Sequence, residues 1–264
     1  MQVVIEGTEV LTGPGIVIED AALAQLRQVA GLPGCVRAVG LPDLHPGMHG
    51  PVGAAFAFDG VVRPALVGSD AGCGVRLTAV RRSRFAGDAL ERRLREEMDG
   101  APYSTDVARK AFEALLAGGI RGLASVDALP PALRILAAAE PEEPPVSRPG
   151  WLEDDLIHAL GTIGGGNHFA EISEVQGVVD TEAGFARRGV AILVHSGSRG
   201  LGKALGDRWR GEVLEVGDPR TAEYLAELEV ACRFARANRF VLMSRLATAL
   251  GAARESSLGA SVDV

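Results

Sequence analysis

Residues 66–77, LVGSDAGCGVRL, place the cysteine Cys73 between two glycines and three residues after Asp70. The apolar run of residues 61–67 predicts a strand that ends at this turn. A thiolate binds borderline divalent cations well, and a carboxylate three residues earlier can reach the same ion if the chain turns between them. A lone cysteine is more often a small buried residue in a turn. The stretch alone therefore leaves a tight turn and a metal site both open.

Working outward, apolar periodicity predicts a mixed α/β protein. The first third reads as strands around one helix at residues 21–29, and an Asp-Gly pair at 59–60 predicts a hairpin turn. Residues 84–140 have helical composition, and the proline-rich stretch 137–150 predicts an exposed loop. Later elements are a short helix ending near 158, a strand at 189–197, a helix after Ser198, and one or two helices over 221–250.

The 264 residues are 47% apolar, which is enough to bury a large core. We expect a single domain over residues 1–264. Glycine-rich loops that carry polar side chains follow predicted strands in both halves of the chain. This pattern predicts an α+β domain with sheets beneath a deep cleft for metal and nucleotide, and with helices at the periphery.

The net charge is −7, from 27 Lys and Arg against 34 Asp and Glu, so no overall basic field is available to hold nucleic acid. Any contact with RNA must be local. The cysteines, at positions 35, 73 and 232, are odd in number and scattered, which indicates a reducing cytoplasm rather than a disulfide framework. No apolar run reaches about 18 residues, so we expect no membrane span.

Four of the five histidines lie in glycine-rich segments. His195 ends an apolar strand, where its ring can point into a cleft, although a bond to backbone would explain it equally well. His168 follows three glycines that let backbone N–H groups approach an anion. Three loops that each offer a metal-type ligand beside glycines favour one shared metal site over packing. His45 and His49 fit either a rigid corner or a functional loop.

Four arginines are candidate contacts to phosphate or RNA, with solvated surface charge as the alternative reading. Arg76 and Arg199 lie beside the glycine-rich loops, and Arg236 and Arg239 lie on the late helix. A serine hydrolase is not expected, because the segment HSGSRG lacks the G-x-S-x-G pattern. No Walker A sequence and no G-x-G-x-x-G after a strand are present, so ordinary P-loop or Rossmann binding is not supported.

Taken together, the glycine-rich segments that carry these residues resemble the RtcB family of RNA-splicing and RNA-repair ligases. The matching blocks are LPDLHPGMHGPVGAAFAF, VVRPALVGSDAGCGVRL, LGTIGGGNHFAEI and LVHSGSRGLGKALG, in family order, with a weaker match in FARANR. The resemblance implies a ligase that depends on GTP and manganese. It would join an RNA 3′-phosphate or 2′,3′-cyclic phosphate to a 5′-hydroxyl end of tRNA or damaged RNA.

The resemblance also implies site residues. Two manganese ions would be bound by Asp70, Cys73, His168 and His195, with the cysteine bridging the ions. The guanine-nucleotide pocket would include Asn167, His168, Phe169, Ala170 and Glu171. Two cations placed close together can neutralise a triphosphate and polarise the phosphorus under attack.

One family feature is missing from this sequence. The family's guanylylated histidine and a further metal-binding His-Asn lie beyond the late helices, and no histidine follows His195 here. We therefore expect a monomeric, cytoplasmic chain that lacks the C-terminal catalytic part, binds metal and does not complete ligation alone. Two alternatives remain open: a non-catalytic module that binds RNA ends or nucleotides, and a metal-dependent cyclic phosphodiesterase.

Overall fold

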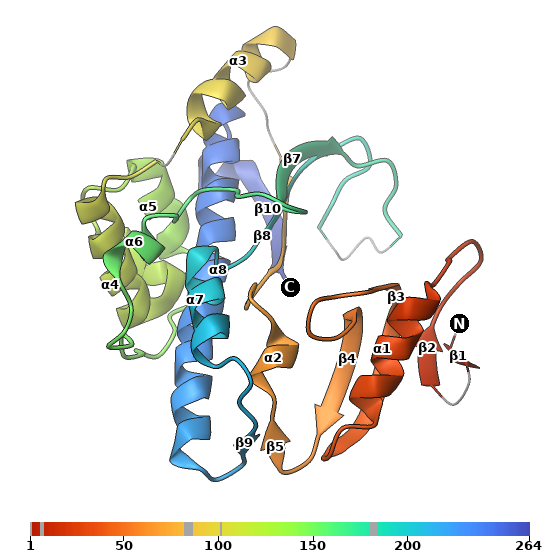
Figure 1. Ribbon diagram of the computed structural model, residues 1–264. Coiled ribbons are helices and arrows are strands. Elements are labelled where there is room, and N and C mark those ends of the chain that lie inside the picture. The colour runs from red at the N-terminus through yellow and green to blue at the C-terminus, as the bar shows by residue number, and fades with distance from the viewer. Residues whose placement is uncertain (1, 6–7, 82–86, 101, 180–183) are drawn as a thin grey trace. The chain divides into compact units, whose positions relative to one another are not determined.

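The computed structural model describes residues 2–5, 8–81, 87–100, 102–179 and 184–264. Within these ranges helices combine with three β-sheets, which confirms the mixed α/β class (Figure 1). The chain divides into two compact units, Met1–Gly68 with Trp209–Tyr224, and Ser69–Arg208 with Leu225–Val264. Within the described residues, no helix combines the length and apolar character that a membrane span requires.

The first unit contains a four-stranded sheet covered by one helix. The strand order is β1-β2-β3-β4, with β2 and β3 parallel and the other two pairs antiparallel. The elements are β1 (Gln2–Ile5), β2 (Thr8–Leu11), α1 (Asp20–Ala30), β3 (Cys35–His45) and β4 (Val52–Phe58). The helix predicted at residues 21–29 is thus confirmed.

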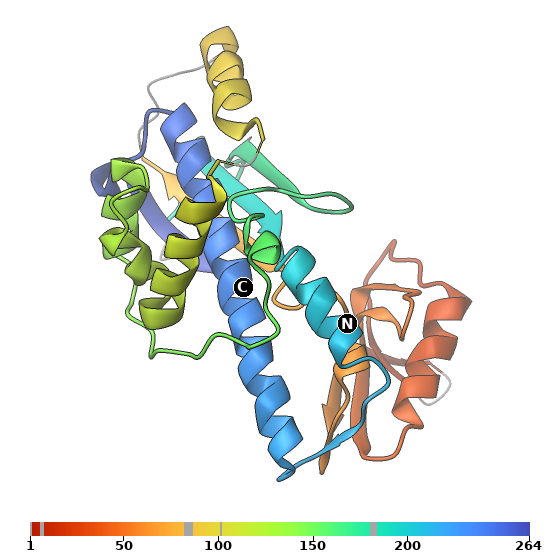
Figure 2. The same ribbon diagram turned by 60° about the vertical axis from the view of Figure 1, so that its left-hand side comes forward.

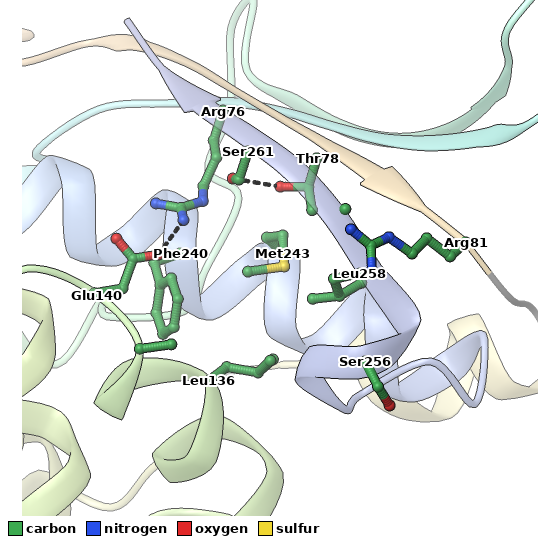
Figure 3. A pocket seen from close by; sticks show the side chains of 12 residues that line it. Arg76, Thr78, Arg81, Leu136, Glu140, Phe240, Met243, Ser256, Leu258 and Ser261 are labelled. Atoms are coloured by element: carbon green, nitrogen blue, oxygen red, sulfur yellow. Dashed lines mark hydrogen bonds and ion pairs between the residues drawn. The ribbon is translucent and has the colours of Figure 1, made fainter. Parts of the chain in front are cut away.

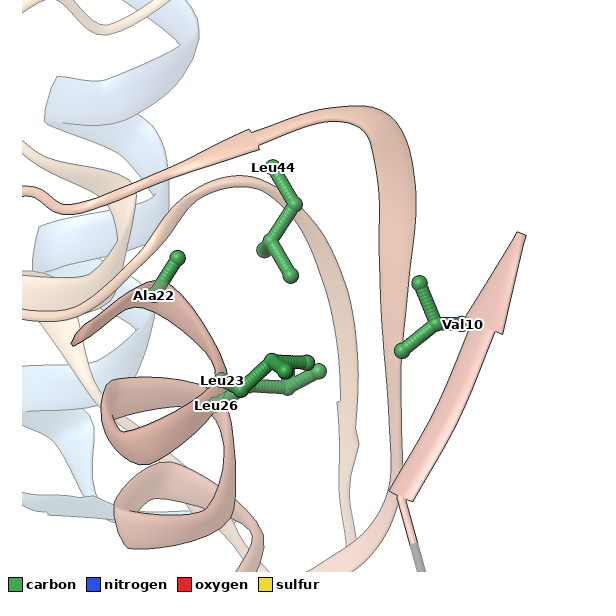
Figure 4. Close-up of a cluster of buried hydrophobic side chains, with 5 residues drawn as sticks. All are labelled: Val10, Ala22, Leu23, Leu26 and Leu44. Carbon is green, nitrogen blue, oxygen red and sulfur yellow. The ribbon is translucent and has the colours of Figure 1, made fainter. Parts of the chain in front are cut away.

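The core of this unit forms where α1 meets the sheet. Leu23 and Leu26 lie three residues apart on α1, so both point from one helix face toward the strands. Val10 of β2 and Leu44 of β3 meet them from the sheet, as Figure 4 shows. Val10 and Leu26 are 0% exposed. Burial of these four side chains therefore fixes α1 on the sheet.

Two predictions for residues 59–67 are wrong. In place of a strand over 61–67, the chain forms β5 (Val61–Val62) and then a short helix, α2 (Pro64–Val67). Pro64 has no N–H group and a fixed φ, which suits the first turn of a helix and not a strand interior. Gly60 takes the expected positive φ, +73°, but no hairpin forms. The reason is that β5 pairs with β9 (Leu214–Glu215) instead of β4.

The second unit contains an antiparallel sheet in the order β10-β6-β8-β7. Its strands are β6 (Gly74–Val80), β7 (Phe169–Glu174), β8 (Val190–Ser196) and β10 (Leu258–Asp263). The strand predicted at 189–197 is confirmed as β8. Cys73, however, precedes a strand instead of following one, because the apolar residues before it form α2.

Helices make up most of the rest of this unit, as the composition of residues 84–140 predicted, and the last of them begins within the first unit. They are α3 (Gly87–Met98), α4 (Thr105–Gly122), α5 (Pro131–Ala138), α6 (Asp154–Ile157), α7 (Gly200–Arg208) and α8 (Pro219–Ala249), with 3-10 turns at Leu123–Ser125 and Glu255–Ser257. Residues 221–250 thus form one long helix and not two.

Helix α8 is buried between helices and the sheet over most of its second half. Figures 1 and 2 show α4 and α5 beside α8. Phe112 of α4 and Phe234 of α8 pack with ring centroids 6.2 Å apart. On the sheet side, the Arg76 guanidinium of β6 lies 5.0 Å from the Phe240 ring centroid. A central helix of this kind can contact loops that enter and leave the sheet.

The exposed loop predicted over residues 137–150 starts later than expected, because α5 continues to Ala138 and Ala137 is buried. Residues 141–149 have no regular secondary structure, and each is exposed or half-exposed. The stretch is nevertheless attached to the fold. The Glu143 carboxylate lies 2.9 Å from Arg236 Nη2 and 3.3 Å from Arg233 Nε, both on α8. These ion pairs hold the loop against the helix.

Candidate metal centre

The strand register brings three distant segments together at one end of the second sheet. In the central pair Gly74 of β6 lies opposite Ser196 of β8, which places Cys73 beside His195. On the other side of β8, Phe169 of β7 lies opposite His195. His168 precedes Phe169 and therefore reaches the same end. Cys73 thus meets histidines that are 95 and 122 residues further along the chain.

The ligand atoms of these three residues form a compact cluster. The Cys73 Sγ lies 3.4 Å from His168 Nε2 and 3.7 Å from His195 Nε2, and all three atoms are within 4.8 Å of one another. Metal–sulfur and metal–nitrogen bonds of ordinary length at a tetrahedral angle put S and N about 3.5 Å apart. The donor set and its spacing therefore fit a divalent cation.

Asp70 adjoins the cluster through His168. Its Oδ2 lies 2.8 Å from His168 Nε2. A side chain at position 197 would block this arrangement, because a Cβ on Gly197 would lie 2.1 Å from Asp70 Oδ1. The glycine after Ser196 thus makes room for the carboxylate, and the four predicted metal residues lie in one group.

The His195 ring is oriented with its unprotonated nitrogen toward the cluster. Its Nδ1 lies 3.0 Å from the Gly74 carbonyl oxygen, which can only accept, so Nδ1 carries the proton. The unprotonated Nε2 then faces Cys73 and accepts a hydrogen bond from Asn167 Nδ2 at 3.2 Å. A backbone carbonyl that fixes the histidine tautomer in this way is typical of metal-ligating histidines.

The His168 ring is held by Arg199. The Arg199 Nη1 lies 3.3 Å from His168 Nδ1, and a guanidinium only donates, so this nitrogen is the acceptor. In the neutral ring the proton is then on Nε2, which faces Asp70 Oδ2, and a cation that binds Nε2 must displace it. The arginine has a left-handed backbone, φ +59°, and its guanidinium fills the space beside Gly164. A Cβ on Gly164 would lie 1.7 Å from Arg199 Nη1. The glycine-rich loop is therefore shaped around this side chain.

The thiol of Cys73 is protonated when no cation is near. Burial of the sulfur, together with the hydrogen bond and charge of Asp70, raises the pKa of Cys73 to about 12, although the charge of Arg239 acts in the opposite direction. The residue as a whole is exposed, but the sulfur lies among two imidazoles and a carboxylate. Cation binding must therefore displace a proton from this sulfur.

Both serines near His195 are fully buried, with Ser196 and Ser198 at 0% exposure. Ser196 Oγ donates to the Ile163 carbonyl oxygen at 3.0 Å. Neither hydroxyl is open to a substrate, which agrees with the exclusion of a serine hydrolase.

The predicted nucleotide residues divide between two roles in the structure. Because side chains alternate along a strand, Phe169 and Glu171 lie on the same sheet face as His195, and Ala170 lies on the other. The Phe169 side chain is 39% exposed, and its ring centroid lies 5.5 Å from that of His195. Asn167 instead contacts the metal ligand His195. An open aromatic ring therefore adjoins the metal cluster.

Of the four candidate arginines, Arg199 contacts a metal-site side chain, and the other three are ion-paired within the fold. Arg236 is partly exposed. The pairs are Arg76 with Glu140 and Asp263, Arg236 with Glu143 and Glu229, and Arg239 with Asp263. Arg76 and Arg239 are 4% and 3% exposed, so little of either is open to a phosphate.

A cavity of about 500 Å³ lies on the opposite face of the sheet from His195. Figure 3 shows Arg76 and Thr78 of β6 pointing into it, toward Phe240 and Met243 of α8. The Thr78 and Ser261 hydroxyls are 2.8 Å apart at its wall. This cavity is separate from the metal cluster because alternate residues of β6 face opposite sides of the sheet.

His45 and His49 belong to the first unit, where both are exposed. Their loop is a fixed corner. Gln25 exchanges two hydrogen bonds of 2.9 Å with the backbone of Gly47, and His45 Nδ1 lies 2.6 Å from the Asp43 carbonyl oxygen. These contacts favour the interpretation of the segment that carries His45 and His49 as a rigid corner.

Asn238 was part of the weaker family match FARANR but was not predicted to have a role in the site. Its side chain contacts two of the segments that lead to metal ligands. The available signal was the polar pair Asn238–Arg239 within the otherwise apolar stretch of residues 237–243.

Residues 25–263 match the family described as tRNA-splicing ligase RtcB. The RNA-splicing ligase RtcB2 of Escherichia coli is 34% identical over 248 residues, which cover 87% of this chain and 53% of that protein. The chain therefore spans about half the length of this curated relative. All four predicted metal residues lie inside the matched range.

Proposed function

Because the chain belongs to the RtcB family, we propose that it supplies the metal centre of an RNA ligase. The reaction would join an RNA 3′-phosphate or 2′,3′-cyclic phosphate to a 5′-hydroxyl end, with GTP and manganese as cofactors. The observation that carries this proposal is the convergence of Cys73, His168 and His195 within 4.8 Å of one another.

Asp70, Cys73, His168 and His195 would hold two manganese ions, with Cys73 as the shared ligand. When bound, the cations would neutralise phosphate oxygens and polarise the phosphorus under attack. The protein's own contribution is to hold the ligands in place. The Gly74 carbonyl fixes the proton of His195 on Nδ1, and Asp70 and Arg199 fix the two nitrogens of His168.

We assign nucleotide recognition to the face of β7 beside the metal cluster. The exposed ring of Phe169 offers a surface on which a purine can stack. The exposed carboxylate of Glu171 lies two residues further along the same face, where it can accept hydrogen bonds from the edge of a guanine. The Arg199 guanidinium provides positive charge next to the cluster for phosphate oxygens.

No histidine follows His195 in this sequence. We therefore propose that this chain binds metal without becoming guanylylated. Incubation with Mn²⁺ and radiolabelled GTP, followed by denaturing electrophoresis, tests this statement. We expect no labelled protein band, and a stable GMP adduct would contradict it.

Metal binding itself is tested with Co²⁺, whose visible and near-ultraviolet bands report thiolate ligation. We expect wild-type protein to develop a thiolate-to-cobalt band, and Cys73→Ser to lose it. His45→Ala is the matched control, because this exposed histidine lies in the first unit. A band that survives Cys73→Ser would refute the proposed ligand set.

An assay on RNA ends separates the alternatives. A metal-dependent phosphodiesterase would open a 2′,3′-cyclic end to a monophosphate with Mn²⁺ and without GTP. A binding module would retain the RNA unchanged and would bind it equally well with EDTA. For the proposed ligase centre we expect the chain to bind RNA ends only when Mn²⁺ is present. We expect this chain alone to leave the RNA ends chemically unchanged.

We also propose a monomer in the cytoplasm. Cys35, Cys73 and Cys232 are all free thiols, which supports a reducing compartment. Sedimentation equilibrium at several protein concentrations tests the monomer, and a mass that rises with concentration would contradict it.

A further inference from the structure

Two adjacent polar residues are buried in the apolar middle of α8. Asn238 is 0% exposed and Arg239 is 3% exposed. Their neighbours Ala237 and Phe240 are also buried. Burial of an amide and a guanidinium costs free energy unless each polar atom finds a partner. The partners of these two side chains therefore indicate what the pair does.

Asn238 connects the loop before His168 with the end of β8. Its Oδ1 accepts from the Gly161 backbone N–H at 2.7 Å, and its Nδ2 donates to the Thr162 carbonyl at 3.1 Å and to Ser196 Oγ at 2.9 Å. Residues 161–162 lead into the glycine-rich turn that carries His168. Ser196 directly follows His195.

Arg239 connects the end of β8 with the loop that carries Cys73. Its Nη1 donates to the Gly72 carbonyl at 2.7 Å and to the Ser196 carbonyl at 2.9 Å. Its Nε donates to Asp263 Oδ1 at 3.0 Å, and Nη2 pairs with the same carboxylate. The guanidinium is thus held by Asp263 on one side, and on the other side it donates hydrogen bonds to two of the metal-binding segments.

From these contacts we propose that Asn238 and Arg239 are positioning residues that set the spacing of the three metal-binding segments. The inference rests on the metal centre proposed above. Two of the segments are bonded to this pair at the residue next to their ligand, Gly72 before Cys73 and Ser196 after His195. The third is bonded at Gly161 and Thr162, where the glycine-rich loop that carries His168 begins. Side chains on one helix therefore determine the affinity and geometry of the site.

The geometry disfavours a direct phosphate contact for Arg239. Its guanidinium is almost fully buried, and the Asp263 carboxylate balances its charge. A lysine could not replace it, because a single ammonium cannot supply the planar fork that reaches two carbonyls and a carboxylate together. Arg239→Lys therefore keeps the positive charge and removes the hydrogen bonds that join Gly72 to Ser196 through the guanidinium.

The same helix offers a matched control in Arg233. This arginine is 2% exposed and donates to the Pro144 carbonyl at 2.9 Å, and it pairs with Glu143 and Glu229. None of these partners belongs to the three metal-binding segments. Arg233→Lys thus disturbs an equally buried guanidinium six residues earlier on the helix without touching the proposed connection.

The test is a Co²⁺ titration of wild type, Arg239→Lys and Arg233→Lys, followed by the thiolate-to-cobalt band and by calorimetry. Second-layer changes of this kind typically lower metal affinity about 10-fold to 100-fold. We expect that loss, with an altered band, in Arg239→Lys. We expect Arg233→Lys to keep the wild-type affinity and spectrum even if its melting temperature falls.

Each outcome decides the inference. Equal metal affinities in the two lysine variants, or a wild-type band in Arg239→Lys, would overturn it while leaving the metal centre intact. Absence of any thiolate band in wild type would refute the metal centre and the inference with it. If Arg239→Lys does not fold, Asn238→Ser replaces it. That variant loses the contacts to Gly161 and Thr162, and we expect it to weaken cobalt binding by a similar factor.

Discussion

Metal binding should release a proton from Cys73. The pKa of this thiol in the metal-free protein is about 12, whereas a bound thiolate carries no proton. At any pH well below that value, the cation competes with one proton for the sulfur. The apparent affinity should therefore rise about tenfold for each pH unit between about pH 7 and pH 9, a total of about a hundredfold.

The assay is calorimetric titration with Mn²⁺ or Co²⁺ in two buffers of different ionisation enthalpy at each pH. The difference in measured heat gives the number of protons released, and we expect a contribution of about one from Cys73. Cys73→Ser provides the control, since a serine hydroxyl keeps its proton throughout this range and the pH dependence should flatten. An affinity in wild type that does not change with pH would refute the reasoning.

Three further predictions concern single side chains. Gly164→Ala places a Cβ 1.7 Å from Arg199 Nη1, so the arginine must leave His168, and we expect cobalt affinity to fall roughly tenfold in a titration. Phe112→Ala removes a fully buried ring and should cost about 3–5 kcal/mol in urea unfolding, whereas Ile135→Ala, at a side chain 57% exposed, should cost far less; equal losses would contradict the packing described here. Burial raises the pKa of Tyr103 to about 12. Because this folded value lies above the ordinary value of about 10, its stabilising contribution should be present below about pH 10 and lost as the pH rises toward 12, and Tyr103→Phe should remove that part of the pH dependence of the melting temperature.

Much of the site could be predicted from the sequence because its signals are local. Cys73 and His195 each lie within two residues of a glycine where an apolar run ends, and His168 lies two residues after three consecutive glycines. Such loop positions commonly carry functional side chains. Helix α8 was also predictable, since its helical periodicity continues over many turns. Both signals depend on residues within a few positions of each other.

The rest depended on contacts between distant residues. The pairing of β5 with β9 joins segments more than 150 positions apart, so the Asp59-Gly60 pair alone could not exclude a hairpin. Arg239 read equally well as a surface charge or a phosphate contact, because its partner Gly72 is 167 residues away. Pro64 was a local signal that the apolar pattern around it obscured.

The order of strands in the second sheet has a consequence for how a cation would enter and leave. The three ligand-bearing segments lie at the ends of β6, β8 and β7, which are hydrogen-bonded neighbours. The ladder spacing of about 4.8 Å places the three strands, and the contacts of Asn238 and Arg239 hold the loops at their ends, so the separation of the segments does not depend on the ion. The scaffold is preorganised, unlike a small zinc domain that unfolds when its metal is removed. We therefore expect chelation to empty the centre reversibly, with the circular dichroism of the protein unchanged.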